Sequence, residues 1–372
     1  EKLLYNAMIH QAGSNWDYIP SNQSMTEGND DQGVWGLTVM EAVERNFTND
    51  ADHPWLELAQ AVYNTMYNRW DVDSCGGGLR WQIFTWNSGY DYKNSISNAC
   101  LFSMAARLAR YTGNTTYAEV AEKVWTWMVE DAQFITEENG EYIIYDGAKI
   151  ANNCSQVTKT RWSYTYGVLM SGCAYLYDFS LNGNGTASDA DDWEGRIGEI
   201  WKALGYFFVN DIMSETSCYS SKSCNTDQVS FRSLFLRGLM ATMQLVNSTQ
   251  SEIMKDIRTS AAGAAKSCSG GSDGVTCGVD WTTGSWDGKY GLGQQMSALE
   301  CILALLANDV PKPYTAFNGG SSTSSNANAG LGTDSTTNQN IIDVTTKDKA
   351  GAGVLTAVVL AVIVGGSIWM VL

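Results

Sequence analysis

Positive charge is scarce in this sequence of 372 residues, which carries 23 Lys and Arg against 40 Asp and Glu and has a formal net charge of −17. A field of that sign repels polyphosphates, so the composition argues against a nucleic-acid partner. An uncharged or weakly charged substrate, such as a glycan, suits the composition better.

Metal-ligand patterns are missing as well. No paired C-x-x-C occurs, and neither of the two histidines, His10 and His53, has a partner at a useful spacing. The sequence therefore predicts no metal site and no cofactor.

Convincing strand patterns are almost absent, and helical patterns of two kinds alternate in their place. One kind is largely apolar and contains Gly, Ala and Ser: residues 32–47, 95–111, 163–179, 231–246 and 291–306. The other kind is amphipathic with charged faces: residues 54–70, 116–134, 189–209 and 251–267.

This alternation, at a spacing of about 50–70 residues, is typical of a repeated helical hairpin. Inner helices must be apolar on two sides, whereas outer helices need one apolar stripe. Closing the hairpins into a ring predicts an all-α toroid over residues 1–312, with a central funnel suited to a glycan. Six hairpins need six inner helices and five are visible, so we expect the first hairpin to lie upstream of Glu1.

Nine cysteines without a metal pattern favour disulfides. Cys218 with Cys224 and Cys268 with Cys277 bracket short polar loops, and Cys75 with Cys154 is a third, weaker pair because both lie in connecting loops. At least one thiol must stay unpaired, and the candidates lie in apolar helical runs: Cys100, Cys173 and Cys301. Six Asn-x-Ser/Thr sequons indicate the secretory pathway: Asn22, Asn46, Asn114, Asn153, Asn184 and Asn247.

The C-terminal part changes composition abruptly. Residues 319–340 are a low-complexity Gly/Ser/Thr/Asn stretch, which predicts a disordered linker over residues 313–350. Residues 351–372 are apolar to the end, and no basic residues follow them. This arrangement predicts a GPI-attachment signal, with attachment near Asn328, Ala329 and Gly330 or Gly332; a tail-anchored helix is the alternative. We therefore expect a protein of the cell surface, held at the plasma membrane or in the cell wall.

The stretch TEGNDDQGVW (residues 26–35) carries the most chemistry. Asp30 and Asp31 stand side by side ahead of an apolar helix, where the helix dipole or a ligand can offset their repulsion. Glycoside hydrolysis needs two carboxyl groups in different protonation states, about 5–5.5 Å apart in retaining enzymes. The alternative is an ordinary N-cap with a second acid in the first turn.

Three stretches of this chain resemble the fungal, GPI-anchored branch of glycoside hydrolase family 76, the mannan endo-1,6-α-mannosidases. They are GNDDQGVWGL, WQIFTWNSGYDYKNSISNACLFSMAARLARYTGNTTYAEVAEKVWTW and TKTRWSYTYGVLMSGCAYLY. The resemblance covers about residues 1–310 and implies an (α/α)6 toroid. It also implies that Asp30 is the nucleophile and Asp31 the general acid/base of a retaining mechanism.

Aromatic and amide side chains near inner-helix ends are the candidates for substrate binding: Trp81, Trp86, Tyr90, Asn94, Asn98, Trp162 and Tyr166. Packing between helices is the alternative for the aromatic residues, and a cap or buried hydrogen-bond network is the alternative for the two asparagines. Lys93 and Arg161 could bind an anionic substituent, although surface or ion-pair roles are favoured for both.

Two outcomes of the same chemistry remain open. A covalent intermediate can be resolved by water, which hydrolyses mannan, or by a sugar hydroxyl, which would pass a GPI-core glycan to wall glucan. A monomeric enzyme is expected in either case. A terpene cyclase is disfavoured, because Gln32, Gly33 and Val34 follow the acidic pair where that class has a longer acidic motif. A non-catalytic glycan-binding or structural wall protein remains the alternative from another class.

Overall fold

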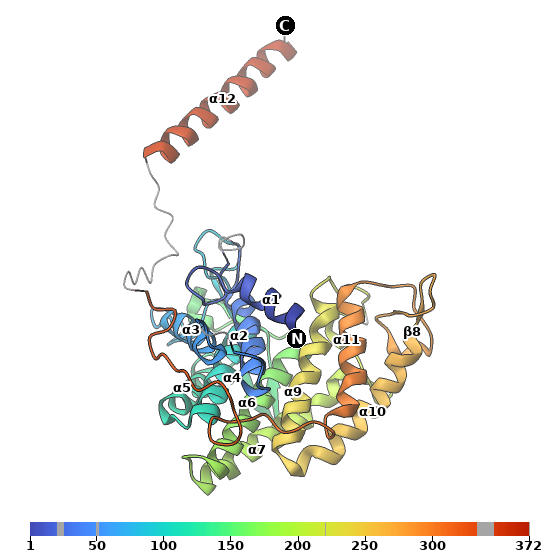
Figure 1. Cartoon of the computed structure of the whole chain (residues 1–372). Helices are drawn as coiled ribbons and strands as arrows, with labels where there is room; N and C mark the ends of the chain where they lie inside the picture. The colour runs from blue at the N-terminus through green and yellow to red at the C-terminus, as the bar shows by residue number, and fades with distance from the viewer. Residues whose placement is uncertain (21–25, 50–51, 220, 333–345, 372) are drawn as a thin grey trace. The chain divides into compact units, whose positions relative to one another are not determined.

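The computed structural model of the chain describes residues 1–20, 26–49, 52–219, 221–332 and 346–371, and it divides the chain into two units, residues 1–335 and 336–372 (Figure 1). The sequon at Asn22 lies outside the described residues. All of the chemistry discussed below belongs to the first unit.

Five helices form the inner layer of the first unit: α2 (Asn29–Glu44), α4 (Ser95–Thr112), α6 (Ser163–Asn182), α9 (Phe231–Leu245) and α11 (Leu292–Leu303). Helix α6 packs against α4 on one side and α9 on the other (Figure 1). The approach of α6 to α9 is close, because a Cβ added to Gly238 would lie 2.1 Å from the carbonyl oxygen of Gly167. Small residues at these positions therefore let two inner helices pack backbone to backbone. Helix α11 differs from the others, since Leu292 and Leu299 are exposed.

Four amphipathic helices form the outer layer: α3 (Trp55–Asn68), α5 (Thr115–Thr126), α7 (Ala187–Ala203) and α10 (Gln250–Ser267). They alternate along the chain with the inner helices, so the predicted all-α alternation is confirmed. The unit also contains two shorter α-helices, α1 (Lys2–Gln11) and α8 (Thr216–Tyr219).

Two of the predicted outer helices end earlier than expected. The segment predicted as 116–134 leaves the α conformation at a π turn, Trp127–Asp131. In the segment predicted as 189–209 the α-helix ends at Ala203, a 3-10 turn follows, and the last two residues form β6 (Phe208–Val209), which pairs with β7 (Ile212–Met213) in a tight hairpin. Asn210 and Asp211 adopt positive φ between these strands, a conformation these two residue types tolerate well and one that a helix cannot contain.

The remaining strands are short and antiparallel. β1 (Tyr92–Asn94) pairs with β4 (Gly147–Lys149), which pairs in turn with β5 (Val157–Thr158). The other pairs are β2 (Ile135–Glu138) with β3 (Glu141–Ile144) and β8 (Cys268–Gly270) with β9 (Thr276–Cys277). They brace the loops at the helix ends and form no separate layer.

All three predicted disulfides are present: Cys75–Cys154, Cys218–Cys224 and Cys268–Cys277. The three predicted unpaired cysteines are buried thiols in inner helices: Cys100, Cys173 and Cys301. Each of these thiols therefore serves as a small apolar core residue.

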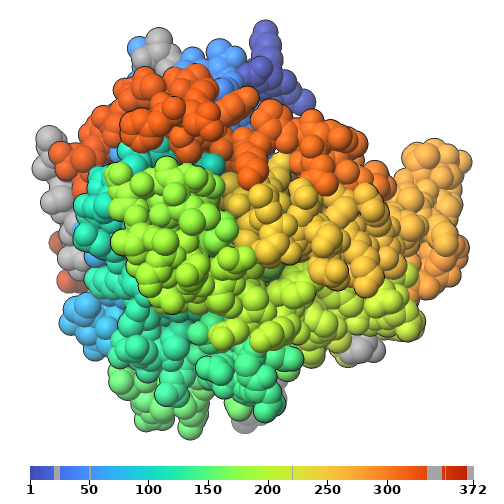
Figure 2. Space-filling model, turned by 90° about the horizontal axis from the view of Figure 1, so that it is seen from below, coloured from blue at the N-terminus to red at the C-terminus, as the bar shows by residue number. Residues whose placement is uncertain are grey.

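The segment that follows α11 corrects the sequence prediction of a linker beginning at residue 313. Residues 313–332 run over the surface of the first unit, as Figure 2 shows in orange and red. The hydroxyl of Ser322 accepts a hydrogen bond from the backbone N–H of Leu56 at the start of α3, and Asn64 donates to the carbonyls of Ala327 and Ala329. Hydrogen bonds from a polar helix face hold this stretch, which is why its low apolar content did not predict the contact.

The second unit contains α12 (Thr346–Val371). The window Lys349–Gly366 has a mean hydropathy of 1.9 and is long and apolar enough to cross a membrane. Its length and composition agree with the predicted apolar tail.

Candidate active site

The two adjacent aspartates occupy the first turn of α2. Gly28 is the N-cap residue, so Asp30 and Asp31 are the second and third residues of the helix rather than its cap. The carboxylate of Asp31 accepts a hydrogen bond from the backbone N–H of Gly28 at 2.8 Å, which is one of the two bonds of a capping box; the glycine N-cap has no side chain to make the other. The positive end of the helix dipole thus offsets part of the repulsion between the two acids.

Asp30 is held by an aromatic donor from outside its helix. The indole Nε1–H of Trp81 donates to Oδ2 of Asp30 at 2.9 Å, while Oδ1 is buried and has no hydrogen-bond partner among the described residues. Burial and the neighbouring charge of Asp31 raise the pKa of Asp30 to about 7. Burial also raises the pKa of Asp31, against the hydrogen bond from Gly28 and together with the charge of Asp227. The pair therefore holds a proton over much of the acidic range.

Trp81 is fixed by backbone contacts on both sides. Its N–H donates to the carbonyl of Tyr92 at 2.7 Å, and its carbonyl accepts from the N–H of Asn29 at 2.8 Å. Gly89 lets the ring lie close to the chain, because it has a φ of +96° and a Cβ there would lie 2.4 Å from the indole. The side chain is still 37% exposed, so it offers a flat face to a ligand beside the acidic pair.

A third acid lies next to the pair. Glu27 is 6% exposed, and neither of its carboxyl oxygens has a hydrogen-bond partner among the described residues. Burial raises its pKa to about 8, with contributions from the charges of Asp31, Asp17 and Asp30. Arg69 lies nearby but uses its guanidinium to donate to the side-chain amides of Asn29 and Gln32. The sequence interpretation missed Glu27, although it stands three residues before Asp30.

The side chains of the two candidate asparagines form hydrogen bonds with backbone groups. Asn94 is the N-cap of α4 and accepts from the N–H of Ser97 at 3.2 Å. Asn98 is fully buried and pairs with both the N–H and the carbonyl of Leu79, at 2.8 and 3.2 Å. These contacts match the alternative of a cap and a buried network. Asn98 supports the loop that leads to Trp81.

The candidate aromatic residues separate into two groups. Trp86 stacks on Phe84, and the Tyr90 ring lies under the guanidinium of Arg80. Trp162 donates from its indole to Asp146 at 2.8 Å and packs edge-on against Phe231. All three are half-buried and keep part of their surface accessible.

Tyr166 is the exception and is withdrawn from the candidate site. Its side chain is fully buried, and its hydroxyl accepts a hydrogen bond from the N–H of Ile144. Tyr164, two residues earlier, lies within electrostatic reach of the pair, since burial and the charge of Asp30 raise the pKa of its hydroxyl. Position in the helix could have predicted this: Tyr164 is the second residue of α6, as Asp30 is of α2, and a toroid brings the N-terminal ends of inner helices to one face.

Neither candidate for an anionic substituent is a free surface cation. Lys93 is fully buried and lies 3.3 Å from the carboxylate of Asp71. Arg161 stacks over the ring of Tyr206 at 4.3 Å. The favoured ion-pair role therefore holds for Lys93.

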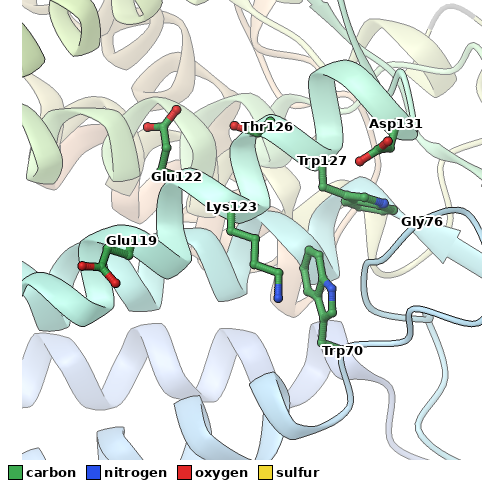
Figure 3. A pocket seen from close by; sticks show the side chains of 8 residues that line it. All are labelled: Trp70, Gly76, Glu119, Glu122, Lys123, Thr126, Trp127 and Asp131. Atoms are coloured by element: carbon green, nitrogen blue, oxygen red, sulfur yellow. The ribbon is translucent and has the colours of Figure 1, made fainter.

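Among the described residues, no group of three or more His, Cys, Asp or Glu side chains could hold a metal ion. A hollow of about 490 Å³ opens on the outer side of α5, lined by residues that include Trp70, Lys123 and Asp131 (Figure 3). In Figure 3 the Lys123 side chain points toward the Trp70 ring. The hollow contains neither member of the acidic pair, so it is a separate feature of the outer surface.

Comparison with known proteins decides the family. The model of glycosyl hydrolase family 76 matches residues 1–317. The chain belongs to glycosyl hydrolase family 76. Among the relatives of this family-76 chain is the mannan endo-1,6-α-mannosidase DFG5 of Candida albicans, 62% identical over 374 residues that cover all of this chain and 80% of the relative. DFG5 of Saccharomyces cerevisiae, which bears the same enzyme name, is 52% identical over 375 residues with the same coverage.

Solved structures of the family agree with the fold. Dfg5 from Chaetomium thermophilum, in complex with glucosamine, has a TM-score of 0.83 and 36% identity, over 90% of this chain and 81% of its own. An inactive variant of a Salegentibacter α-1,6-mannanase, with two consecutive aspartates replaced by asparagine and α-1,6-mannotriose bound, has a TM-score of 0.60 and 16% identity, over 77% of each chain. The all-α toroid predicted for this family-76 chain is therefore confirmed.

Proposed function

We propose that this chain is a retaining glycosidase that cleaves α-1,6-mannosidic linkages in mannan, with Asp30 and Asp31 as its catalytic pair. The observation that carries the proposal is the geometry of Asp30. One carboxyl oxygen is held by Trp81, and the other is unpartnered among the described residues and beside a second acid. Relatives named mannan endo-1,6-α-mannosidase, at 52–62% identity, support the substrate and the linkage.

In this proposal Asp30 attacks the anomeric carbon, and Asp31 donates a proton to the leaving oxygen. Oδ2 stays on the Trp81 indole, which stabilises the ionised carboxylate. Asp31 is the more exposed of the two and is free to meet the leaving group. Water, deprotonated by Asp31, then releases the covalent glycosyl-enzyme with retention of configuration.

The proton must be on Asp31 in the productive state. In the free protein, burial favours the proton on Asp30. The oxocarbenium-like transition state carries positive charge next to Asp30 and therefore favours its ionised form, which leaves the shared proton to Asp31.

The proposal is tested by digesting linear α-1,6-mannan with the wild-type chain and with Asp30→Asn and Asp31→Asn. Each variant should lose at least about 10²-fold in activity while still binding the glycan, because a general acid or base contributes about 10²–10⁴. Asp309→Asn, at an exposed position, is the matched control and should keep full activity. Full activity in either catalytic variant would remove the pair from the mechanism, and binding without turnover in the wild type would favour a non-catalytic wall protein.

Transfer to wall glucan is the same chemistry with a sugar hydroxyl in place of water. We propose it as the second outcome because the apolar C-terminal segment, as a GPI-attachment signal or as a membrane span, would place the enzyme at a membrane surface, close to acceptor glycans. Supplying a glucan acceptor and separating the products by mass distinguishes a transfer product from free reducing ends. Mass spectrometry of the native C-terminus tests the proposed GPI anchor, which requires the apolar tail to be absent.

A further inference from the structure

Lys93 is an unusual residue to find in a protein interior. Its side chain is fully buried in β1, and its ammonium donates to the backbone carbonyls of Asp71, Ser74 and Gly77 at 2.8, 2.7 and 2.6 Å. A buried ammonium is costly unless its donors are satisfied, and here all three donors have carbonyl acceptors. In return, Lys93 satisfies three carbonyls of one loop and so fixes the course of that loop.

The side chain of Asp71 links Lys93 to Arg80. Its Oδ2 atom lies 3.3 Å from the ammonium of Lys93 and 2.8 Å from the guanidinium of Arg80. Its backbone N–H also donates to the carbonyl of Gly78 at 3.1 Å, which closes the loop on itself. Asp71 thus joins the buried lysine to the residue that immediately precedes Trp81.

Arg80 completes the connection to the acidic pair. Its guanidinium also donates to the carbonyl of Tyr90 at 3.1 Å, and its own carbonyl accepts from the side-chain amide of Asn29 at 2.9 Å. Asn29 is the first residue of α2 and precedes Asp30. Loop 71–80 is therefore fastened at one end to Lys93 and at the other to the helix that carries the catalytic pair.

We propose that Lys93 and Asp71 are positioning residues for Asp30, which hold loop 71–80 so that the Trp81 indole donates to the Asp30 carboxylate. The proposal rests on the proposed function. Neither residue meets substrate; both act through Arg80 and Trp81. Removing either one should loosen the indole from Asp30, and the pH dependence of catalysis should respond as it does when the indole N–H is deleted.

The test compares Lys93→Met and Asp71→Asn with Trp81→Phe, which deletes the indole N–H directly. A donor to the ionised form lowers the pKa of a carboxyl, so its loss moves the acid limb of the pH–rate profile to higher pH. All three variants should show this shift with kcat reduced about tenfold; KM should stay nearly unchanged in Lys93→Met and Asp71→Asn, whereas Trp81→Phe should also raise KM because it shortens the exposed ring. Lys149→Met is the matched control, because that lysine is exposed on the neighbouring strand β4, and it should leave the profile unmoved.

Other groups also act on Asp30, and they remain in place in every variant: Asp31, Glu27, Cys100 and Tyr164. The double variant Asp71→Asn/Trp81→Phe should shift the limb no further than Trp81→Phe alone, because both changes remove one interaction. Additive shifts, or a lowered Tm with an unmoved pH profile, would overturn the positioning role. Asp71→Asn serves as the second arm if Lys93→Met does not fold, since Asp71 is only partly buried. An active Asp30→Asn variant would instead refute the proposed function on which this inference rests.

Discussion

The ring of Tyr164 lies flat on the ring of Phe231, with centroids 3.8 Å apart and planes 3° from parallel. The stack fixes the Tyr164 hydroxyl near Asp30, whose charge is the foremost one acting on it. Two residues along the same helix, Tyr166 has the same side chain in a purely structural contact. The two tyrosines therefore form a matched pair for experiment.

Tyr164→Phe should keep the stack and the folded stability but reduce kcat/KM about tenfold, because it deletes one hydrogen-bonding group near the reacting carboxylate. Tyr166→Phe should do the opposite, lowering the free energy of unfolding by about 1 kcal/mol through loss of the acceptor for Ile144, with activity unchanged. Kinetics on α-1,6-mannan and denaturant melts read out both. Reduced activity in Tyr166→Phe with full activity in Tyr164→Phe would restore the original assignment.

The acidic pair should give a bell-shaped pH–rate profile with two apparent pKa values that belong to both residues together. Asp31→Asn should recover partly on a substrate whose leaving group needs no proton, such as an aryl mannoside with an acidic phenol. Asp30→Asn should form no covalent glycosyl-enzyme in intact-mass spectra. The reverse rescue pattern would exchange the two roles, and inverted configuration in the product would exclude the retaining mechanism.

Glu27→Gln should stabilise the protein at neutral pH. Because burial raises the folded-state pKa of Glu27 to about 8, the folded state binds a proton there that the unfolded state has released, so stability falls as pH rises from about 4.5 towards 8. The glutamine should leave Tm unchanged at pH 4.5 and raise the free energy of unfolding by up to about 3 kcal/mol at pH 7. The exposed Glu137→Gln is the control, and equal stability of Glu27→Gln and wild type at both pH values would contradict the buried, protonated state.

The disulfides should differ in their contribution to stability. The Cys75–Cys154 bond spans 79 residues, whereas Cys218–Cys224 spans 6. Chain-entropy arguments give about 4.5 kcal/mol for the long loop and about 2 kcal/mol for the short one. Paired Cys→Ala variants in denaturant melts should show this order, and an equal or reversed loss would mean that the chain-entropy term does not set their contribution.

Ser322, in the segment after α11, caps the N-terminal end of α3. Leu56 is the second residue of α3, and its N–H has no acceptor within the helix; Ser322 provides one. Ser322→Ala should cost about 1 kcal/mol and should increase proteolytic cleavage of residues 319–332. Ser324→Ala, at an exposed neighbouring position, should change neither quantity.

Much of the fold, and the acidic pair itself, could be predicted from local patterns in the sequence. Alternating apolar and amphipathic segments predicted the helices of both layers, and the short loops bracketed by cysteines predicted two disulfides. The adjacent aspartates predicted the acidic pair, because two carboxyl groups at one helix start are chemically conspicuous in any sequence. Each helix, cysteine loop and acidic pair is a signal within one continuous segment of the chain.

Other features depend on contacts between distant segments. Tyr164 and Tyr166 are only two positions apart in the sequence, and the packing of α6 decides which hydroxyl feels the charge of Asp30 and which accepts from Ile144. The packing of residues 319–332 was missed because backbone and amide hydrogen bonds to α3, rather than apolar side chains, hold that stretch. Glu27 was missed because its significance lies in burial without a partner, which a sequence does not display.

The binding of residues 319–332 to α3 limits how far from a membrane the enzyme could work. If they were free, the twelve residues 319–330 could extend about 40 Å and act as a long tether. Held along α3 by Ser322, Asn64 and their partners, they supply none of that reach. An anchor attached at Asn328 or Gly330 would then keep the folded unit within a short distance of its own lipid surface, so glycan chains would have to come to the enzyme at the membrane.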